Sequence, residues 1–237
     1  MNRRGQGSFI TIMPLVVVFL TIALLAFKPT ALAPFQPSAP PEGISSCQNI
    51  TSAGYYYLTQ SISGLQAGRD VCIDIQANNV VFTCSLYNIT GSGSGKGVYA
   101  QGRTSITIRD CPNISMYATG IYLDGTNYST ISNSGLFLNP PPGGGGASGL
   151  HLSNSNFNNI TNVTANNNDY GIYLSTSSNN TLSNNTVNNN TNYGIYLSSS
   201  SNNTLTNNTA NSNSYYGIFL SSSSNYNTIS NNNASLN

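Results

Sequence analysis

The sequence predicts an all-β fold, a solenoid of stacked rungs with about 22–23 residues in each rung. The main observation is a recurring glycine, which is followed by an alternating apolar phrase and then by runs of Asn and Ser. Successive glycines are 23, 29, 22, 23 and 23 residues apart, and the long interval contains "PPPGGGG" at residues 140–146, an insertion whose removal restores the period. Such a period is typical of stacked repeats, each of which needs its neighbours to bury its apolar side. The recurring glycines are Gly97, Gly120, Gly149, Gly171, Gly194 and Gly217.

Three short strands are expected in each rung. The first follows the glycine and reads "GIYL" or a close variant, so alternation places Ile195 and Leu197 inward and Tyr196 outward. The second is centred on one apolar residue, and the third offers a small or β-branched residue to the interior. The residues of the second strand are Ile131, Ile160, Leu182, Leu205 and Ile229, and those of the third are Ala165, Val187, Ala210 and Ala234.

Runs such as "SSSSNN" between the strands are suited to turns, because Asn tolerates the left-handed backbone conformation and Ser and Asn bond to their own backbone. The same residues disfavour helices. Each second strand is followed, two residues after its apolar residue, by an asparagine that alternation places inward. We therefore expect an inward ladder of hydrogen-bonded amides. Its members are Asn162, Asn184, Asn207 and Asn231.

The N-terminal segment, residues 1–33, has a membrane-targeting pattern. Arg3 and Arg4 precede a 19-residue apolar run from Phe9 to Phe27, which predicts a hydrophobic helix with its positive end inside the cell. The run is long enough to span a bilayer, yet "ALA" at 31–33 has the form of a cleavage site, and "RRGQ" resembles the cleavage site of archaeal pilin-type signals. A cleaved signal peptide and a membrane anchor both remain open.

The rest of the chain is expected outside the cell, as a Pro-rich linker over residues 34–45 and a solenoid over residues 46–237. The sequence stops at "NNNASLN", part-way through a rung. This favours a fragment truncated at its C-terminus; end-to-end self-association through the open edge is the alternative.

Four cysteines in the exported part are typical of disulfides. We expect Cys47 to pair with Cys72 and Cys84 with Cys111, because a repeat fold brings segments near in sequence together, and each closed loop would stabilise the fold by about 3 kcal/mol. Buried free thiols and a zinc site are the alternatives. Zinc is disfavoured because no C-x-x-C pair occurs and the single histidine, His151, is 40 residues from Cys111.

Charge excludes one class of partner. Only 5% of the residues are charged and the formal net charge is +1, which excludes a basic nucleic-acid binder.

The stretch "NNVVFTCSLYNITGSGSGKGVYAQGRTSITIRDC" at 78–111, with the "GIYL" and "NTIS" units after it, resembles the right-handed parallel β-helix repeat proteins of the NosD-like and pectate-lyase-like superfamily. The resemblance covers about residues 47–237 and implies a right-handed β-helix. The family includes periplasmic and surface proteins as well as polysaccharide lyases, hydrolases and epimerases. Some relatives are labelled copper proteins, but copper needs imidazole or sulfur ligands, and after the leader this chain has one His and one Met. We expect no metal and no cofactor.

A polysaccharide-active enzyme needs carboxylates, usually with Arg or Lys against an acidic substrate. The weak catalytic candidates are Asp74, Asp110, Asp124 and Arg109, with Arg103 close by in sequence. No charged residue follows Asp169. We therefore favour a structural, adhesive or glycan-binding surface protein and keep the enzyme, or a degenerate relative of one, as the alternative.

An outward row of aromatic residues is the candidate binding site for a polysaccharide or cell-surface glycan, because planar rings pack against sugar faces. The alternative is that the rings only stabilise adjacent strands. His151 is expected to substitute for an aromatic ring. The row comprises Tyr99, Tyr122, His151, Tyr173, Tyr196 and Phe219, with a second line at Tyr170, Tyr193 and Tyr216.

N-x-S/T acceptors predict a glycoprotein. Those on turns, Asn127, Asn179 and Asn202, are the favoured sites, whereas an inward Asn184 or Asn207 could not be modified once folded. The other acceptors are Asn49, Asn88, Asn113, Asn159, Asn162, Asn189 and Asn233.

Overall fold

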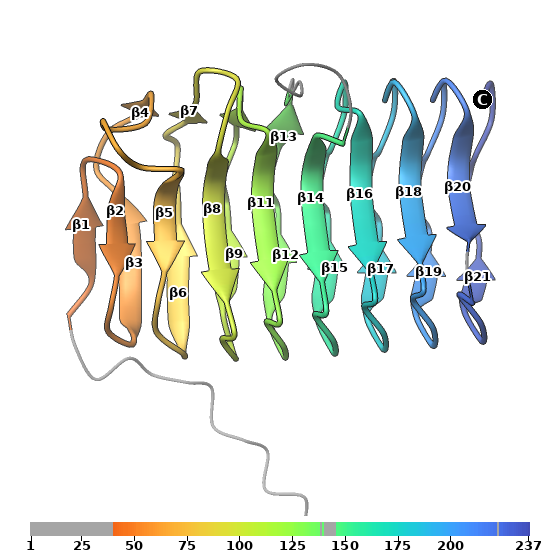
Figure 1. The fold of residues 1–237 in the computed structure, drawn as a ribbon, viewed down its shortest axis with the longest axis horizontal. Coiled ribbons are helices and arrows are strands. Elements are labelled where there is room, and N and C mark those ends of the chain that lie inside the picture. Colours follow the sequence, from red (N-terminus) through yellow and green to blue (C-terminus); the bar gives the residue numbers. More distant parts are fainter. Residues whose placement is uncertain (1–39, 138, 140–145, 222) are drawn as a thin grey trace, which may run out of the picture. The chain divides into compact units, whose positions relative to one another are not determined.

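The computed structural model describes residues 40–137, 139, 146–221 and 223–237, and these residues form a parallel β-solenoid (Figure 1). The predicted all-β class and stacked rungs are confirmed. The predicted hydrophobic helix over residues 1–33 and residues 34–39 of the predicted linker lie outside the described residues. Within the part of the chain that the structure describes, no helix is long and apolar enough to cross a membrane.

Three parallel sheets form the sides of the solenoid. The sheet of long strands, called the front sheet here, comprises β2 (Gln48–Ile50), β5 (Val71–Ile75), β8 (Lys96–Gln101), β11 (Thr119–Asp124), β14 (Ser148–Ser153), β16 (Tyr170–Ser175), β18 (Tyr193–Ser198) and β20 (Tyr216–Ser221). The second comprises β1 (Glu42–Ile44), β3 (Gly54–Leu58), β6 (Val80–Thr83), β9 (Thr107–Arg109), β12 (Thr130–Ser132), β15 (Asn159–Thr161), β17 (Thr181–Ser183), β19 (Thr204–Thr206) and β21 (Thr228–Ser230). The third comprises β4 (Ile62–Ser63), β7 (Ile89–Thr90), β10 (Ile114–Ser115) and β13 (Leu136–Phe137).

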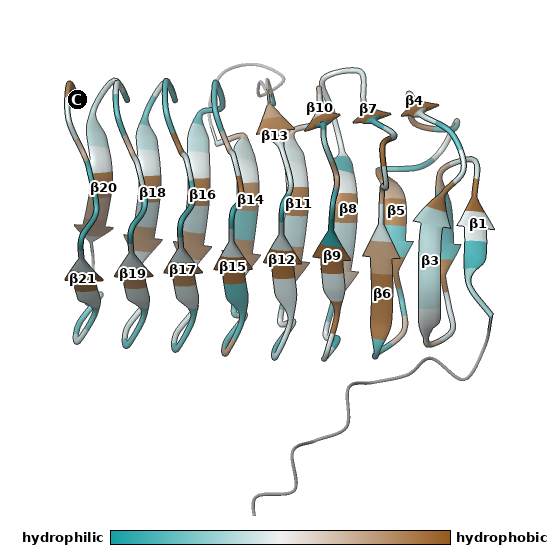
Figure 2. Cartoon of the chain, turned by 180° about the vertical axis from the view of Figure 1, so that it is seen from behind, coloured by the Kyte–Doolittle hydropathy of each residue, from teal (hydrophilic) through white to brown (hydrophobic). Residues whose placement is uncertain are grey.

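The rungs stack in register, like residue above like residue. Between β16 and β18, Ile172 pairs with Ile195 and Leu174 with Leu197, and all four side chains are fully buried. Hydrophobic residues aligned in this way form a band across β12 to β21 (Figure 2). In the later rungs, isolated bridges between Thr164, Thr186 and Thr209 replace the third strand. The predicted third inward residues Ala165, Val187 and Ala210 are buried, whereas Ala234 is exposed.

The recurring glycine is required by close stacking of the rungs and not by its backbone conformation. A Cβ atom added to Gly194 would lie 2.5 Å from the carbonyl oxygen of Gly217, one rung on. At Gly171 the same atom would lie 2.6 Å from the carbonyl oxygen of Gly194. Real Cβ atoms do not approach an oxygen so closely, so any other residue would push the rungs apart.

Left-handed residues form the corners of each rung, and they correct the predicted asparagine ladder. The φ angle of Asn184 is 56° and its side chain is exposed; the next residue, Asn185, is 1% exposed. The left-handed residue ends strand alternation, so the residue after it points inward. The predicted inward ladder is therefore wrong by one position: Asn162, Asn184, Asn207 and Asn231 all have positive φ and all are exposed.

The interior does contain asparagine ladders, one residue further along. Nδ2 of Asn185 donates to Oδ1 of Asn208 at 2.9 Å, and Nδ2 of Asn208 donates to Oδ1 of Asn232 at 2.9 Å. Each Oδ1 also accepts a backbone N–H from the preceding rung, so the buried amides are satisfied. Two further amide rows repeat this pattern. The first comprises Asn158, Asn180, Asn203 and Asn227, and the second comprises Asn168, Asn190, Asn213 and Asn237.

Both predicted disulfides are confirmed. Cys47 is bonded to Cys72 and Cys84 to Cys111, with Cα–Cα distances of 4.3 and 4.5 Å. Because disulfides persist in oxidising compartments, this pairing indicates a location outside the cytoplasm.

Candidate functional site

A continuous row of rings runs along the outer face of the front sheet, from β8 to β20. Strand pairing places Tyr99, Tyr122, His151, Tyr173, Tyr196 and Phe219 at one register position, as predicted. We call these six residues the ring row. All six are half-buried, because the neighbouring rings cover part of each one.

The rings of the row stack on one another. The centroids of Tyr122 and His151 are 4.7 Å apart with planes inclined by 13°, and those of Tyr173 and Tyr196 are 4.9 Å apart with planes inclined by 6°. Ring faces inside the row are therefore covered by their neighbours. The row offers ring edges and phenol hydroxyls to a ligand, instead of the open faces that sugar stacking needs.

Two neutral rows flank the ring row in the later rungs. On one side Tyr170, Tyr193 and Tyr216 stack with centroid distances of 5.6 and 6.0 Å. On the other side Ser153, Ser175, Ser198 and Ser221 share one register position and are half-buried. The phenol oxygen of Tyr196 lies 2.9 Å from Oγ of Ser221, so the hydroxyls of the two rows are within reach of one another.

The other end of the ring row carries charge. Nζ of Lys96 lies 5.0 Å from the Tyr99 ring centroid and 5.7 Å from that of Tyr122. Asp74 occupies the register position of Tyr99 on the preceding strand, β5. Asp124 accepts a 3.0 Å hydrogen bond from Gln101. Burial, and after it the charges of Asp124 and Asp74, raise the pKa of Tyr99.

His151 lies in the middle of the stack, between Tyr122 and Tyr173. Burial lowers the pKa of His151 to about 4, against a smaller opposing effect of the Asp124 charge. The imidazole is therefore neutral at pH 7. Its Nε2 atom is buried and has no hydrogen-bond partner among the residues that the structure describes. The ring takes the place of a tyrosine in the stack, as expected.

Sequence reasoning missed the gathering of Lys96, Tyr99, Tyr122, Asp124 and His151, which we call the charged cluster. It grouped Asp74 and Asp124 with Asp110, Arg103 and Arg109 because those residues are spread over neighbouring rungs. The structure places Asp74 and Asp124 on the front sheet, whereas Arg109 lies at the end of β9 in the second sheet and pairs with Asp110 at 3.0 Å. Alignment of the repeats on their glycines would have put Lys96 and Asp124 on the face of the rings.

A hollow of about 180 Å³ adjoins the charged end of the row. It is lined by Asn49, Arg69, Asp70, Val71 and Asp74. Arg69 donates to Oδ1 of Asn49 at 2.7 Å and to the Val71 carbonyl oxygen at 3.1 Å, so its guanidinium is fixed at the rim.

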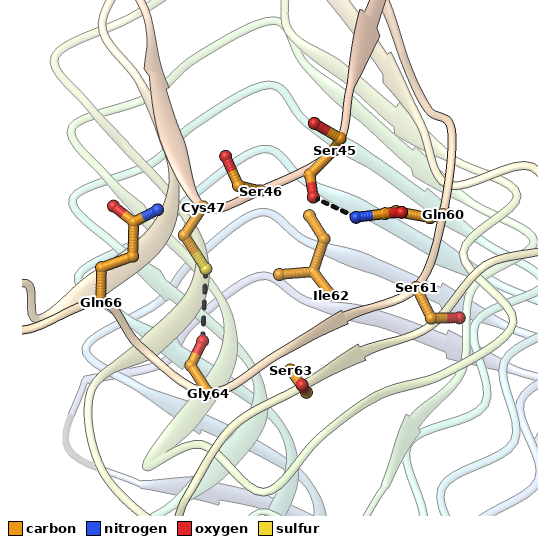
Figure 3. A pocket seen from close by; sticks show the side chains of 9 residues that line it. All are labelled: Ser45, Ser46, Cys47, Gln60, Ser61, Ile62, Ser63, Gly64 and Gln66. Atoms are coloured by element: carbon orange, nitrogen blue, oxygen red, sulfur yellow. Dashed lines mark hydrogen bonds between the residues drawn. The ribbon is translucent and has the colours of Figure 1, made fainter.

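A second hollow of about 210 Å³ lies beside β4 and is lined by neutral groups (Figure 3). Gln60 donates from its side chain to the carbonyl oxygen of Ser45 at 2.9 Å. In neither hollow, nor elsewhere in the described ranges, are three or more His, Cys, Asp or Glu side chains arranged to hold a metal ion.

Three parallel sheets, stacked polar ladders and disulfides define an extracytoplasmic parallel β-solenoid. The chain belongs to the family described as the right-handed beta helix region, whose model matches residues 71–234. No curated protein matches the chain.

Among solved structures, the chain is similar to a double mutant of the periplasmic alginate epimerase AlgG, with 15% identity, a TM-score of 0.45, and coverage of 78% of this chain and 70% of the other. It is also similar to the Dettilon tailspike protein, with 14% identity, a TM-score of 0.37, and coverage of 72% of this chain and 47% of the other.

Proposed function

We propose that this protein is a secreted or membrane-anchored cell-surface β-solenoid that binds a polysaccharide or cell-surface glycan along the ring row. The observation that supports this most is the unbroken outward row of rings, which has neutral hydroxyls on both sides from β16 to β20. No charged side chain follows Asp169, so this face suits a neutral glycan. Residues 1–33 would supply export or anchorage.

The proposed ligand lies across the strands, parallel to the row. Successive rungs are about 4.8 Å apart, so from β16 to β20 each rung presents one phenol of the flanking tyrosine row and one serine hydroxyl to the next sugar of an extended chain. Because ring faces are covered, contact is made mainly through hydroxyl groups and ring edges. The satisfied amide ladders below the face keep these groups in fixed positions, which reduces the ordering cost of binding.

A glycan array tests this proposal. The triple variant Tyr122→Ala, Tyr173→Ala, Tyr196→Ala is expected to lose the glycan signals that the unmodified chain gives. The matched control removes another stacked aromatic pair, Tyr128 and Phe157, whose centroids are 5.1 Å apart and which lie outside the ring row. Equal signals from the triple variant and the unmodified chain, or no signal from the unmodified chain, would remove the ring row as a glycan site.

A second function is favoured by the charged cluster: removal of the proton next to the carboxylate of a uronide. Neutral His151 would accept the proton from carbon, Lys96 would neutralise the substrate carboxylate, and protonated Tyr99 would give its proton to the leaving sugar oxygen as that bond breaks. Because Nε2 of His151 is covered, the accepting atom must be Nδ1.

The product of this elimination carries a conjugated double bond, so ultraviolet absorbance is the assay. Activity on a uronan that is lost in Lys96→Met and kept in Arg103→Met would support the enzyme. No absorbance change with any uronan would exclude this elimination.

A further inference from the structure

A row of exposed asparagines follows the corner between the second sheet and the third side of each rung. Asn162, Asn184 and Asn207 occupy this corner, with φ angles of 53°, 56° and 57°. Each of them begins an N-x-T triplet, which ends at Thr164, Thr186 or Thr209. We call these three asparagines the corner row.

The side chains of the corner row are available for modification. Asn184 and Asn207 make no side-chain hydrogen bond within the described residues. In each case the next residue in the chain, such as Asn185, points inward and makes the interior hydrogen bonds. Nδ2 of Asn162 makes one long, exposed bond to Asn133, at 3.3 Å.

Two other acceptor triplets are less free. Asn127, favoured from sequence, is half-buried, and its Oδ1 accepts the backbone N–H of Asn156 at 2.6 Å. In the triplet of Asn189, the hydroxyl of Thr191 is bonded to Asp169 at 2.9 Å.

The corner row also lies away from the ring row. The chain passes from β16 through a corner that holds Asn179, then along β17, and only then reaches Asn184. The whole second side of the rung therefore separates Asn184 from the front sheet. A sugar at this corner leaves the ring row uncovered.

Adjacent members of the row are one rung apart, about 4.8 Å. The backbone N–H of Asn184 donates directly to the Thr206 carbonyl oxygen at 3.1 Å, next to Asn207. Two branched oligosaccharides attached at that spacing would occupy the same space.

We propose that the corner row is an N-glycosylation site that is occupied at alternate rungs, either at Asn184 or at Asn162 and Asn207. In the transfer, Nδ2 displaces the diphosphate of a lipid-linked oligosaccharide from the anomeric carbon. A C–N bond forms, the C–O bond breaks, the lipid diphosphate leaves, and the amide proton passes to a base of the transferase. The role of the ring row does not enter this proposal.

The test is peptide mapping of the full chain secreted by a host that performs N-glycosylation. Enzymatic removal of the glycans in ¹⁸O water labels each occupied asparagine, and Asp-N, applied before this step, is the protease to use because no Asp follows Asp169, so Asn184 and Asn207 stay on one peptide. We expect label at the corner row and no peptide labelled at adjacent members. Intact mass before glycan removal gives the number of glycans on each molecule.

The variant Asn184→Gly removes the central acceptor and keeps the positive φ. We expect at least a twofold rise in occupancy at Asn162 and Asn207 in this variant, with an unchanged thermal unfolding temperature. The matched control, Asn202→Gly, removes an acceptor at the other corner and is expected to leave corner-row occupancy unchanged. A secreted chain without label at any of the three asparagines, or with Asn184 and Asn207 labelled on the same peptide, would overturn the proposal.

Discussion

Nδ2 of Asn185 donates to Oδ1 of Asn208 at 2.9 Å, and Oδ1 of Asn185 accepts the backbone N–H of Val163 at 2.9 Å. An amide carries both a donor and an acceptor, so one residue type can satisfy itself indefinitely along a stack. This explains how the later rungs have a polar interior without ionisable groups.

Replacement of a ladder amide should destabilise the rungs around it. In Asn185→Leu the backbone N–H of Val163 and the carbonyl oxygen of Ile160 lose their side-chain partner. Because these buried groups are left unpaired, the free energy of unfolding should fall by about 2–4 kcal/mol. Hydrogen exchange of the amides in β15, β17 and β19 measures it. The change at the neighbouring exposed residue, Asn184→Gly, should leave the opening free energies derived from exchange within a few tenths of a kcal/mol of those of the unmodified chain. Equal protection in the two variants would contradict the role of the ladder.

Added bulk at the recurring glycine should also destabilise the stack. Gly194→Ala places a methyl group against the Gly217 carbonyl oxygen and should cost about 1–3 kcal/mol, the usual range for overpacking. The comparison is Gly125→Ala, where the nearest atoms are 3.8 Å away and only the positive φ opposes the change. Urea unfolding should rank Gly194→Ala as the less stable of the two; the reverse order would show that stacking does not require the glycine.

Reduction of the disulfides should weaken the early rungs selectively. Each bridge closes a loop of about 25 residues and is worth about 3 kcal/mol on the chain-entropy estimate. Hydrogen exchange after treatment with a reducing agent should therefore accelerate in β2, β5, β6 and β9 and remain slow in β16 to β19. Uniform acceleration along the chain would show that the rungs unfold as one unit.

Acid should destabilise the fold through His151. Its pKa is about 4 in the folded protein and about 6.5 when unfolded, so between these values the unfolded chain binds the extra proton. The contribution of the neutral imidazole to the free energy of unfolding is therefore fully present above pH 6.5. It falls by about 3 kcal/mol as the pH drops to 4. The variant His151→Phe, with the ring that Phe219 has at the same register, should lack this component. Parallel pH profiles of unfolding free energy for the two proteins would contradict the burial of the imidazole.

The period of the fold could be predicted from sequence because stacking imposes the same demand on every rung. Gly171 and Gly194 each face the carbonyl oxygen of the equivalent glycine one rung on, and Ile172 pairs with Ile195, so identical residues recur. The pairing of Cys47 with Cys72 follows from the same proximity. The inward asparagine could not be assigned by strand alternation, because the left-handed Asn184 reverses the direction of the next side chain.

The charged cluster could not be predicted from sequence distance. Lys96 and His151 are 55 residues apart, and only the exact stacking of β8, β11 and β14 brings their rows together. The residue pattern also could not predict that the ring faces are covered, since an outward tyrosine can lie flat on a sheet or stack against its neighbour.

The contact between the ring row and a glycan is tested most directly by calorimetric titration of the glycan found on the array against the double variant Tyr122→Phe, Tyr173→Phe. This change keeps every ring in the stack and removes two phenol hydroxyls. At about 1 kcal/mol for each of the two hydrogen bonds, affinity should fall by about 30-fold. Affinity equal to that of the unmodified chain would contradict binding through the hydroxyl edge of the row.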